Sequence, residues 1–171
     1  MPETMLIQLW VNGVAQSRTV EPRTHLIDFL REDLGIKGAR VGCEHGVCGA
    51  CTVRLDGEIV RGCLVLAVQA NGHDVETLDG ASDRHDVTEL QQAFHARNAL
   101  QCGFCTSGML LTASALLVEQ PDADREQVRE YMSGNYCRCT GYQAIVDAVC
   151  DVLTARRQAP SADLADTAAI D

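Results

Sequence analysis

The stretch CEHGVCGACTV, residues 43–53, places Cys43, Cys48 and Cys51 in the spacing C-x4-C-x2-C. Cysteines in so short a run suit four kinds of chemistry: a disulfide framework, a zinc site, an iron–sulfur cluster or a reactive thiol. A fourth cysteine, Cys63, follows after eleven residues, across a predicted hairpin. This spacing is that of a [2Fe–2S] site, in which four thiolates converge on a compact, negatively charged core.

The glycines of this loop favour a cluster over the alternatives. Gly42, Gly46 and Gly49 tolerate unusual φ angles and leave backbone N–H groups free to face sulfur. Zinc is disfavoured because three of the ligands would come from one short glycine-rich loop. Disulfides are disfavoured because the chain has nine cysteines, an odd number, and begins without an export signal. We therefore predict a [2Fe–2S] cluster with four ligands: Cys43, Cys48, Cys51 and Cys63.

A second set of four cysteines occurs later in the chain. Cys102 and Cys105 form C-x2-C, and Cys137 and Cys139 form C-x-C thirty-one residues later. Each pair lies at a predicted helix start, where free N–H groups and the positive end of the dipole stabilise thiolates. Two such helix starts that meet would make a closed site for a second cluster or, as the alternative, for zinc. The ninth cysteine, Cys150, lies on an apolar helix face and is predicted to be a core residue.

Composition limits the partners of the chain. Its 171 residues suit one domain or two small ones, and 46% hydrophobic residues allow a packed core. The net charge of −10 argues against a nucleic-acid partner, which requires clustered Lys and Arg. No apolar run approaches the roughly 20 residues of a membrane span, so no membrane insertion is expected. The start, MPETMLIQLW, lacks a basic n-region and a cleavage site, so a cytoplasmic location is expected, and export of the folded chain on a partner's signal stays open.

The first part of the chain predicts a small sheet. Asn12-Gly13 and Asp56-Gly57 are strong hairpin turn signals, each between apolar strands. Between these hairpins, residues 24–34 predict a helix that is capped by Thr24 and stopped by Gly35. A short closing strand follows the second hairpin. This order of elements predicts an α+β fold with one helix across the sheet.

Beyond the polar stretch 80–85, the pattern is helical. Asp86 and Asp124 each begin a predicted capping box, and residues 107–120 predict a helix that is apolar on one side. We therefore expect three parts: a sheet domain at residues 1–80, a helical domain at residues 81–157 and a flexible tail at residues 158–171.

Three motifs of the chain also resemble those of a known family: GCEHGVCGACTVRLDG at 42–57, QCGFCTSGML at 101–110 and GNYCRCTGYQAIVDAV at 134–149. In this order they resemble the small iron–sulfur subunit of the xanthine dehydrogenase family, the molybdenum hydroxylases. The resemblance runs from about residue 5 to residue 157. It implies an N-terminal β-grasp domain like that of plant ferredoxin, a C-terminal four-helix domain, and a [2Fe–2S] cluster in each.

The resemblance also implies a role and partners. Electrons would pass from a molybdenum cofactor in a large partner subunit to the second cysteine set, then to the first, then to FAD in a medium subunit or another acceptor. Substrate chemistry would take place on the large subunit, so no catalytic residue is expected here. Gln101 and Cys139 match positions that contact the pterin of the molybdenum cofactor. Ser107 stands where proline is common and is expected to cap the helix instead.

Two other functions stay open on the sequence. One is a free-standing ferredoxin-type electron carrier, against which the second cysteine set and its helical domain argue. The other is a zinc-stabilised interaction module, which a colourless purified protein would support. The chain carries no G-x-G-x-x-G fingerprint, so flavin or NAD sites are expected on partners.

Overall fold

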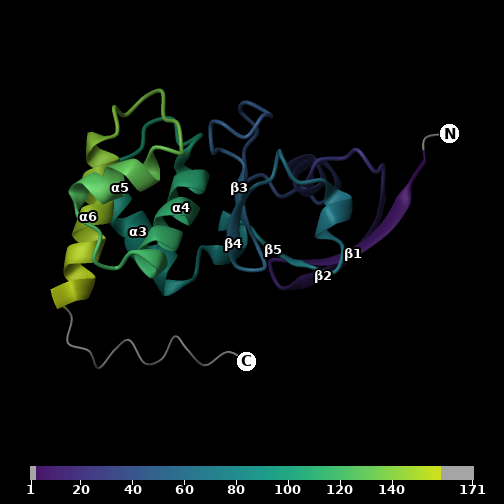
Figure 1. The fold of residues 1–171 in the computed structure, drawn as a ribbon, viewed down its shortest axis with the longest axis horizontal. Helices are drawn as coiled ribbons and strands as arrows, with labels where there is room; N and C mark the ends of the chain where they lie inside the picture. Colours follow the sequence, from purple (N-terminus) through teal and green to yellow (C-terminus); the bar gives the residue numbers. More distant parts are fainter. Residues whose placement is uncertain (1–2, 159–171) are drawn as a thin grey trace.

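The computed structural model describes residues 3–158 and consists of a sheet half and a helical half that lie side by side (Figure 1). The α+β class predicted from the sequence is therefore confirmed. Of the predicted tail at 158–171, Gln158 is the last residue of a helix, and the remainder lies outside the described residues. No helix within residues 3–158 combines the length and the apolar character that a membrane span requires.

The sheet half contains one five-stranded sheet in the order β2-β1-β5-β3-β4. Its strands are β1 (Met5–Val11), β2 (Val14–Val20), β3 (Thr52–Leu55), β4 (Glu58–Arg61) and β5 (Asp74–Glu76). β1 and β5 pair in parallel, and the other neighbours pair antiparallel. Both predicted hairpin turns are confirmed, because Asn12-Gly13 and Asp56-Gly57 have positive φ at both residues.

The helix between the hairpins differs from the prediction. It is a short α1 (Leu26–Asp28) that continues into the π-helical η1 (Phe29–Asp33), and a 3-10 helix η2 (Ala67–Ala70) lies further along the chain. Thr24 does not cap it: the N-cap is His25, without a side-chain bond, and the carbonyl of Thr24 accepts from the N–H of Ala67 at 2.8 Å. Gly35 does follow the helix with φ of +72°, as predicted.

The helical half begins with a short α2. Its members are α2 (Leu78–Ala81), α3 (His85–Ala96), α4 (Thr106–Glu119), α5 (Arg125–Met132) and α6 (Gln143–Gln158). The capping box at Asp124 is confirmed, with its carboxylate accepting from the N–H groups of Glu126 and Gln127. The box at Asp86 is wrong, because the N-cap of α3 is Arg84, two residues earlier, and Asp86 pairs with Arg54 of the sheet.

Helix α4 lies between the other helices and the sheet (Figure 1). The prediction of one apolar side is wrong for this helix, because residues 107–114 are all buried, polar ones included. A helix enclosed on nearly every side is apolar nearly all round rather than amphipathic. Its position explains the difference: one face packs on α3 and α5, and another packs on β3.

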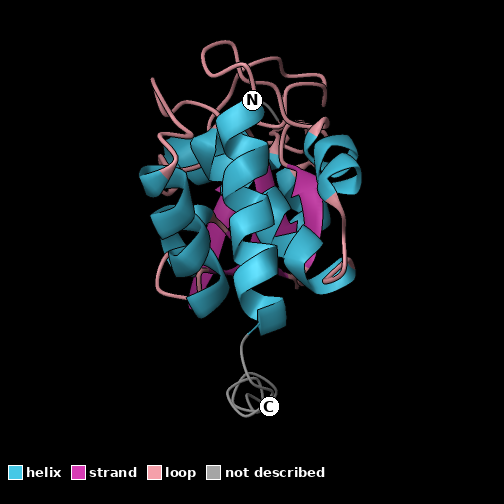
Figure 2. Ribbon diagram, turned by 90° about the vertical axis from the view of Figure 1, so that its left-hand side faces the viewer, coloured by secondary structure: helices cyan, strands magenta, loops and turns pink. Residues whose placement is uncertain are grey.

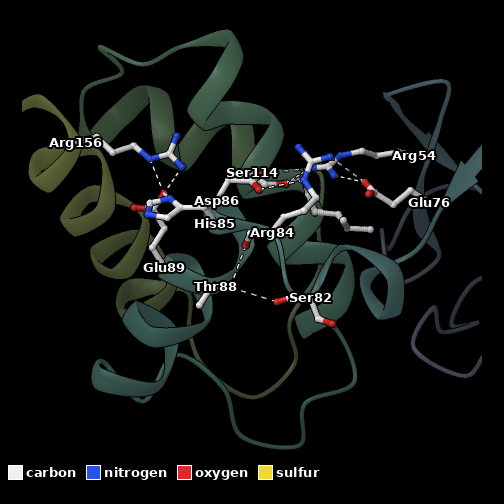
Figure 3. A network of polar contacts seen from close by, with 11 residues as sticks. Arg54, Glu76, Ser82, Arg84, His85, Asp86, Thr88, Glu89, Ser114 and Arg156 are labelled. Atoms are coloured by element: carbon white, nitrogen blue, oxygen red, sulfur yellow. Dashed lines mark hydrogen bonds and ion pairs between the residues drawn. The ribbon is translucent and has the colours of Figure 1, made fainter. Parts of the chain in front are cut away.

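A buried ion-pair network joins the two halves (Figure 3). Arg54 of β3 has a side chain only 7% exposed and pairs with Glu76 of β5 and with Asp86 of α3. It also donates to the hydroxyl of Ser114 in α4 at 2.6 Å. Arg84 adds a second cation, at 3.2 Å from Asp86 and 3.5 Å from Glu76. One buried guanidinium therefore holds two strands and two helices together.

Replacing Arg54 by methionine is expected to lower the free energy of unfolding by about 3–5 kcal/mol, since two largely buried carboxylates lose their main cation. Urea denaturation of the purified chain, followed by circular dichroism, measures the change. Arg97→Met is the matched control, because it breaks an exposed pair with Asp151 and should change stability little. Equal stability of the two variants would contradict the importance of the network.

Candidate metal centres

The first four cysteines come together as two pairs of side chains. Cys43 lies in hydrogen-bonding contact with Cys48, and Cys51 lies in contact with Cys63. Backbone N–H groups point at the sulfurs: that of Cys48 donates to Cys43 Sγ at 3.3 Å, and that of Gly46 donates to Cys63 Sγ at 3.3 Å. The hairpin of β3 and β4 brings Cys63 back to the loop, as the sequence predicted.

Cys43 and Cys51, one from each pair, differ in how readily they ionise. The backbone N–H of Cys48, helped by that of His45, lowers the pKa of Cys43 to about 6. Burial raises the pKa of Cys51 to about 12. Cys43 is therefore a thiolate at neutral pH, whereas Cys51 becomes one only when a bound cation offsets its burial.

The glycines of the loop have separate reasons to be glycine. Gly46 and Gly49 have φ of +81° and +74°, which side-chain-bearing residues rarely adopt. Gly42 does not have a positive φ, contrary to the prediction that it too supplies an unusual backbone. A Cβ atom at Gly42 would instead lie 3.0 Å from the sulfur of Cys48. Glycine is needed there to leave room for sulfur.

The second four cysteines also form two pairs. The sulfurs of Cys102 and Cys139 lie 3.6 Å apart, and Cys105 lies in hydrogen-bonding contact with Cys137. Cys105 is the N-cap of α4, as predicted. The prediction of a helix start is only approximate for the other pair, because α6 begins at Gln143, after a short loop. That loop, rather than the helix end itself, presents Cys137 and Cys139 to the first pair.

Hydrogen bonds also distinguish the sulfurs of the second set. Burial opposes ionisation of Cys137, but the hydroxyl of Thr140 and neighbouring backbone N–H groups outweigh it and lower its pKa. Thr140 Oγ1 lies 3.1 Å from this sulfur. Burial raises the pKa of Cys105 to about 12, whereas the N–H of Phe104 lowers that of Cys102. A side-chain hydrogen bond with Cys102 raises the pKa of Cys139. The threonine was not predicted, although it directly follows the C-x-C motif.

The cysteine geometry suits a two-iron cluster. Within residues 3–158, no three His, Cys, Asp or Glu side chains are grouped closely enough to hold a single metal ion. Each set instead offers two pairs of thiols, and a [2Fe–2S] cluster takes four thiolates, two on each iron. All eight cysteines are free of disulfides in the structure, so the donors are available. The side chains present therefore fit the group that the spacing predicts.

Two further predicted residues can be placed. Gln101 is exposed, and its amide nitrogen donates to the backbone carbonyl of Cys139 at 3.0 Å, so the structure brings this predicted pair together. Ser107 does not cap α4: its hydroxyl is buried and has no hydrogen-bond partner among the described residues, contrary to the prediction. Cys150 is half-buried against the helical core, which agrees with its predicted packing role.

Two family models match this chain, one mainly to the sheet half and one mainly to the helical half. The family model described as a 2Fe-2S iron-sulfur cluster binding domain matches residues 10–81, and the one described as a [2Fe-2S] binding domain matches residues 76–150. Caffeine dehydrogenase subunit gamma of Pseudomonas sp. (strain CBB1) is 49% identical, over 93% of this chain and 97% of its own. The chain belongs to the small iron–sulfur subunits of the molybdenum hydroxylase family.

Other relatives of this family agree. The 6-hydroxypseudooxynicotine dehydrogenase complex subunit beta of Paenarthrobacter nicotinovorans is 53% identical, over 85% of this chain and 92% of its own. The crystal structure of quinoline 2-oxidoreductase from Pseudomonas putida 86 contains a chain with 51% identity and a TM-score of 0.83, covering 91% of this chain and 98% of that one. The N-terminal half is thus ferredoxin-like, and the chain is an electron-transferring iron–sulfur subunit of an oxidoreductase.

Proposed function

We propose that this subunit carries two [2Fe–2S] clusters, one on each cysteine set, and relays electrons from a molybdenum cofactor in a large partner subunit. The observation that carries the proposal is the arrangement of eight cysteines as two sets of two pairs, each with N–H groups directed at sulfur. Bound clusters of this kind take up and release one electron at a time. The ligands would be Cys43, Cys48, Cys51 and Cys63 for one cluster, and Cys102, Cys105, Cys137 and Cys139 for the other.

Protein groups around the sulfurs prepare both sites. Backbone N–H groups and the Thr140 hydroxyl offset negative charge on the thiolates, and such bonds tune reduction potentials. We assign the first site to a β-grasp domain at residues 1–80 and the second to a four-helix domain at residues 81–157. The order of helices α3 to α6 and the mixed sheet support this division.

Exposed apolar side chains near the two cysteine sets support the proposal that partner subunits bind there. Leu100, Phe104 and Tyr136 are each at least 40% exposed and flank the second set. Val47 and Leu64 are similarly exposed beside the first set. Apolar residues exposed around a functional site are typical of protein interfaces. We propose that the molybdenum subunit covers the second set and that an FAD-binding medium subunit, or another acceptor, docks at the first.

The positions of Gln101 and Cys139 support contact with the pterin of the molybdenum cofactor. Both residues are exposed, so a partner's cofactor can reach them. The amide nitrogen of Gln101 is engaged with Cys139, and its oxygen has no partner within residues 3–158. Cys139 would thus serve both as a ligand and as a contact. Substrate chemistry stays on the large subunit, and the cytoplasmic location and the absence of a nucleic-acid partner stay predictions.

The second cysteine set argues against a free-standing ferredoxin-type carrier, which needs only one cluster, and a direct link joins the two sets. The N–H of Tyr136, which precedes Cys137, donates to the carbonyl of Cys48 at 2.8 Å. The two cysteine loops therefore contact each other through the backbone, which suits electron passage through the chain from one site to the other. Co-purification with a large partner would support the subunit function, whereas purification as a single chain would support a free carrier.

The purified subunit is expected to contain four iron and four acid-labile sulfide per chain, because each four-cysteine set takes one [2Fe–2S] cluster. Iron and sulfide analysis, with EPR of the reduced protein, measures this and should give two distinct signals. Zinc in place of iron, or a single [4Fe–4S] signal, would overturn the assignment.

Cys48→Ser should remove the first EPR signal and keep the second, because the two ligand sets lie on separate loops. Cys150→Ala is the matched control, since this cysteine packs against the helical core and lies outside both sets. It should keep both signals and lower stability by about 1 kcal/mol. Loss of a cluster in the control would show that the ligand sets are assigned wrongly.

Gln101→Leu should leave both clusters assembled but slow their reduction by substrate in the complete complex, or weaken binding of the large subunit. Slower reduction or weaker binding is expected because leucine leaves the polar group of the pterin without a hydrogen-bond partner, at a cost of about 1–3 kcal/mol. Rapid-reaction reduction of the clusters measures the rate, and Gln92→Leu on the exposed face of α3 is the control. Wild-type rates and affinity in the Gln101 variant would leave its bond to Cys139 as its only role.

A further inference from the structure

Asn135 is a polar side chain that is completely buried where the two cysteine loops meet. Its amide nitrogen donates to the carbonyl of Gly49 at 3.2 Å, across 86 residues of chain. Its amide oxygen accepts from the hydroxyl of Thr112 at 3.0 Å and from the guanidinium of Arg61 at 3.3 Å. The side chain thus bonds to the first cysteine loop, to α4 and to β4 at the same time.

Two glycines, Gly49 and Gly108, lie so close to this amide that no larger residue fits at either position. A Cβ atom at Gly49 would lie 2.6 Å from the amide nitrogen of Asn135, and one at Gly108 would lie 2.2 Å from the carbonyl oxygen of Gly49. Three chain segments therefore meet here without side-chain bulk between them. Arg61 also bonds to the backbone beside Asn135, donating to the carbonyl of Gly134 at 2.7 Å.

This amide lies directly beside the link between the two cysteine sets. Gly49 follows Cys48, and Asn135 precedes Tyr136, whose N–H donates to the carbonyl of Cys48. The bond between Asn135 and Gly49 and the bond between Tyr136 and Cys48 thus run in parallel between the same two loops. Because the two bonds join neighbouring residues of the same two loops, a shift of one loop relative to the other affects both.

We propose that Asn135 is a positioning residue for electron transfer: its buried amide fixes the separation and orientation of the two cysteine loops, and with them the coupling between the two redox centres. The inference rests on the proposed function, because it assumes that both sets carry clusters. An amide is required because the site needs a donor toward Gly49 and an acceptor for Thr112 and Arg61 in one side chain. A carboxylate offers only the acceptor, and an aliphatic side chain offers neither.

Two variants separate the roles of the amide. Asn135→Asp keeps the acceptor for Thr112 and Arg61 and removes the donor to Gly49, whereas Asn135→Ala removes both. Asn71→Ala is the matched control, because the Asn71 side chain also accepts a backbone bond, from Gln8 at 2.7 Å, but does so in the sheet half. All three are prepared as the full chain with its clusters, and iron content establishes assembly.

The first measurement is hydrogen exchange of the Tyr136 amide, which reads the bond to Cys48 directly. We expect exchange about tenfold faster or more in both Asn135 variants, as the loss of one buried bond implies. The amide of Val128 in α5, which bonds to Asp124, serves as the internal reference and should keep its rate. Unchanged exchange at Tyr136, or equal acceleration at Val128, overturns the positioning role.

The second measurement is the magnetic interaction between the two reduced clusters, seen as splitting of their EPR signals or as faster relaxation of one by the other. Such interactions fall steeply with separation, so both Asn135 variants should lose the wild-type interaction while Asn71→Ala keeps it. Two assembled clusters with the wild-type interaction would contradict the proposal. If the wild-type protein lacks two [2Fe–2S] signals, the proposed function fails instead, and the exchange measurement still decides whether Asn135 positions the loops.

Discussion

The structure depends on holding four sulfur atoms together although their thiolates repel one another. The protein meets this constraint with backbone N–H groups, such as those of Gly46 and Cys48, which point at sulfur from a loop of unusual φ. In the second set, the hydroxyl of Thr140 adds a side-chain donor. The strands and helices beneath these loops hold the donor groups in position around the sulfurs. Figure 2 shows loops gathered at one end of the molecule, beyond the helices and strands.

Both hairpin turn signals and the cap signal at Asp124 predicted local structure correctly. Asn12-Gly13 and Asp56-Gly57 determine their turns because only residues that tolerate positive φ fit there. Asp124 caps α5 because its carboxylate lies within one helical turn of the N–H groups from which it accepts hydrogen bonds. Cysteine spacing predicts the first ligand set for a similar reason: three of its four cysteines lie within nine residues of the chain. The family resemblance then supplied the partners, which no local pattern contains.

The differences from prediction arise where distant parts of the chain compete with a local preference. Asp86 has the sequence of a cap, but the buried Arg54 of β3 attracts its carboxylate more strongly than exposed N–H groups do. Helix α4 was expected to be amphipathic because the sequence does not reveal that it is enclosed by a sheet as well as by helices. Asn135 was part of a recognised motif, yet its partners Gly49, Arg61 and Thr112 are brought to it only by the tertiary fold.

The two cysteine sets differ in their exposure to solvent, and this has a consequence for the life of the subunit outside its complex. Cys51 and Cys63 are each only 2% exposed, whereas Cys102 and Cys139 are exposed at the surface. Exposed thiolates are the ones that dissolved oxidants reach first. Oxidants therefore reach the second set more easily than the first, and the molybdenum subunit proposed to cover it would also limit oxidation of its cysteines. Assembly with that partner would then protect the exposed cysteines of the second set.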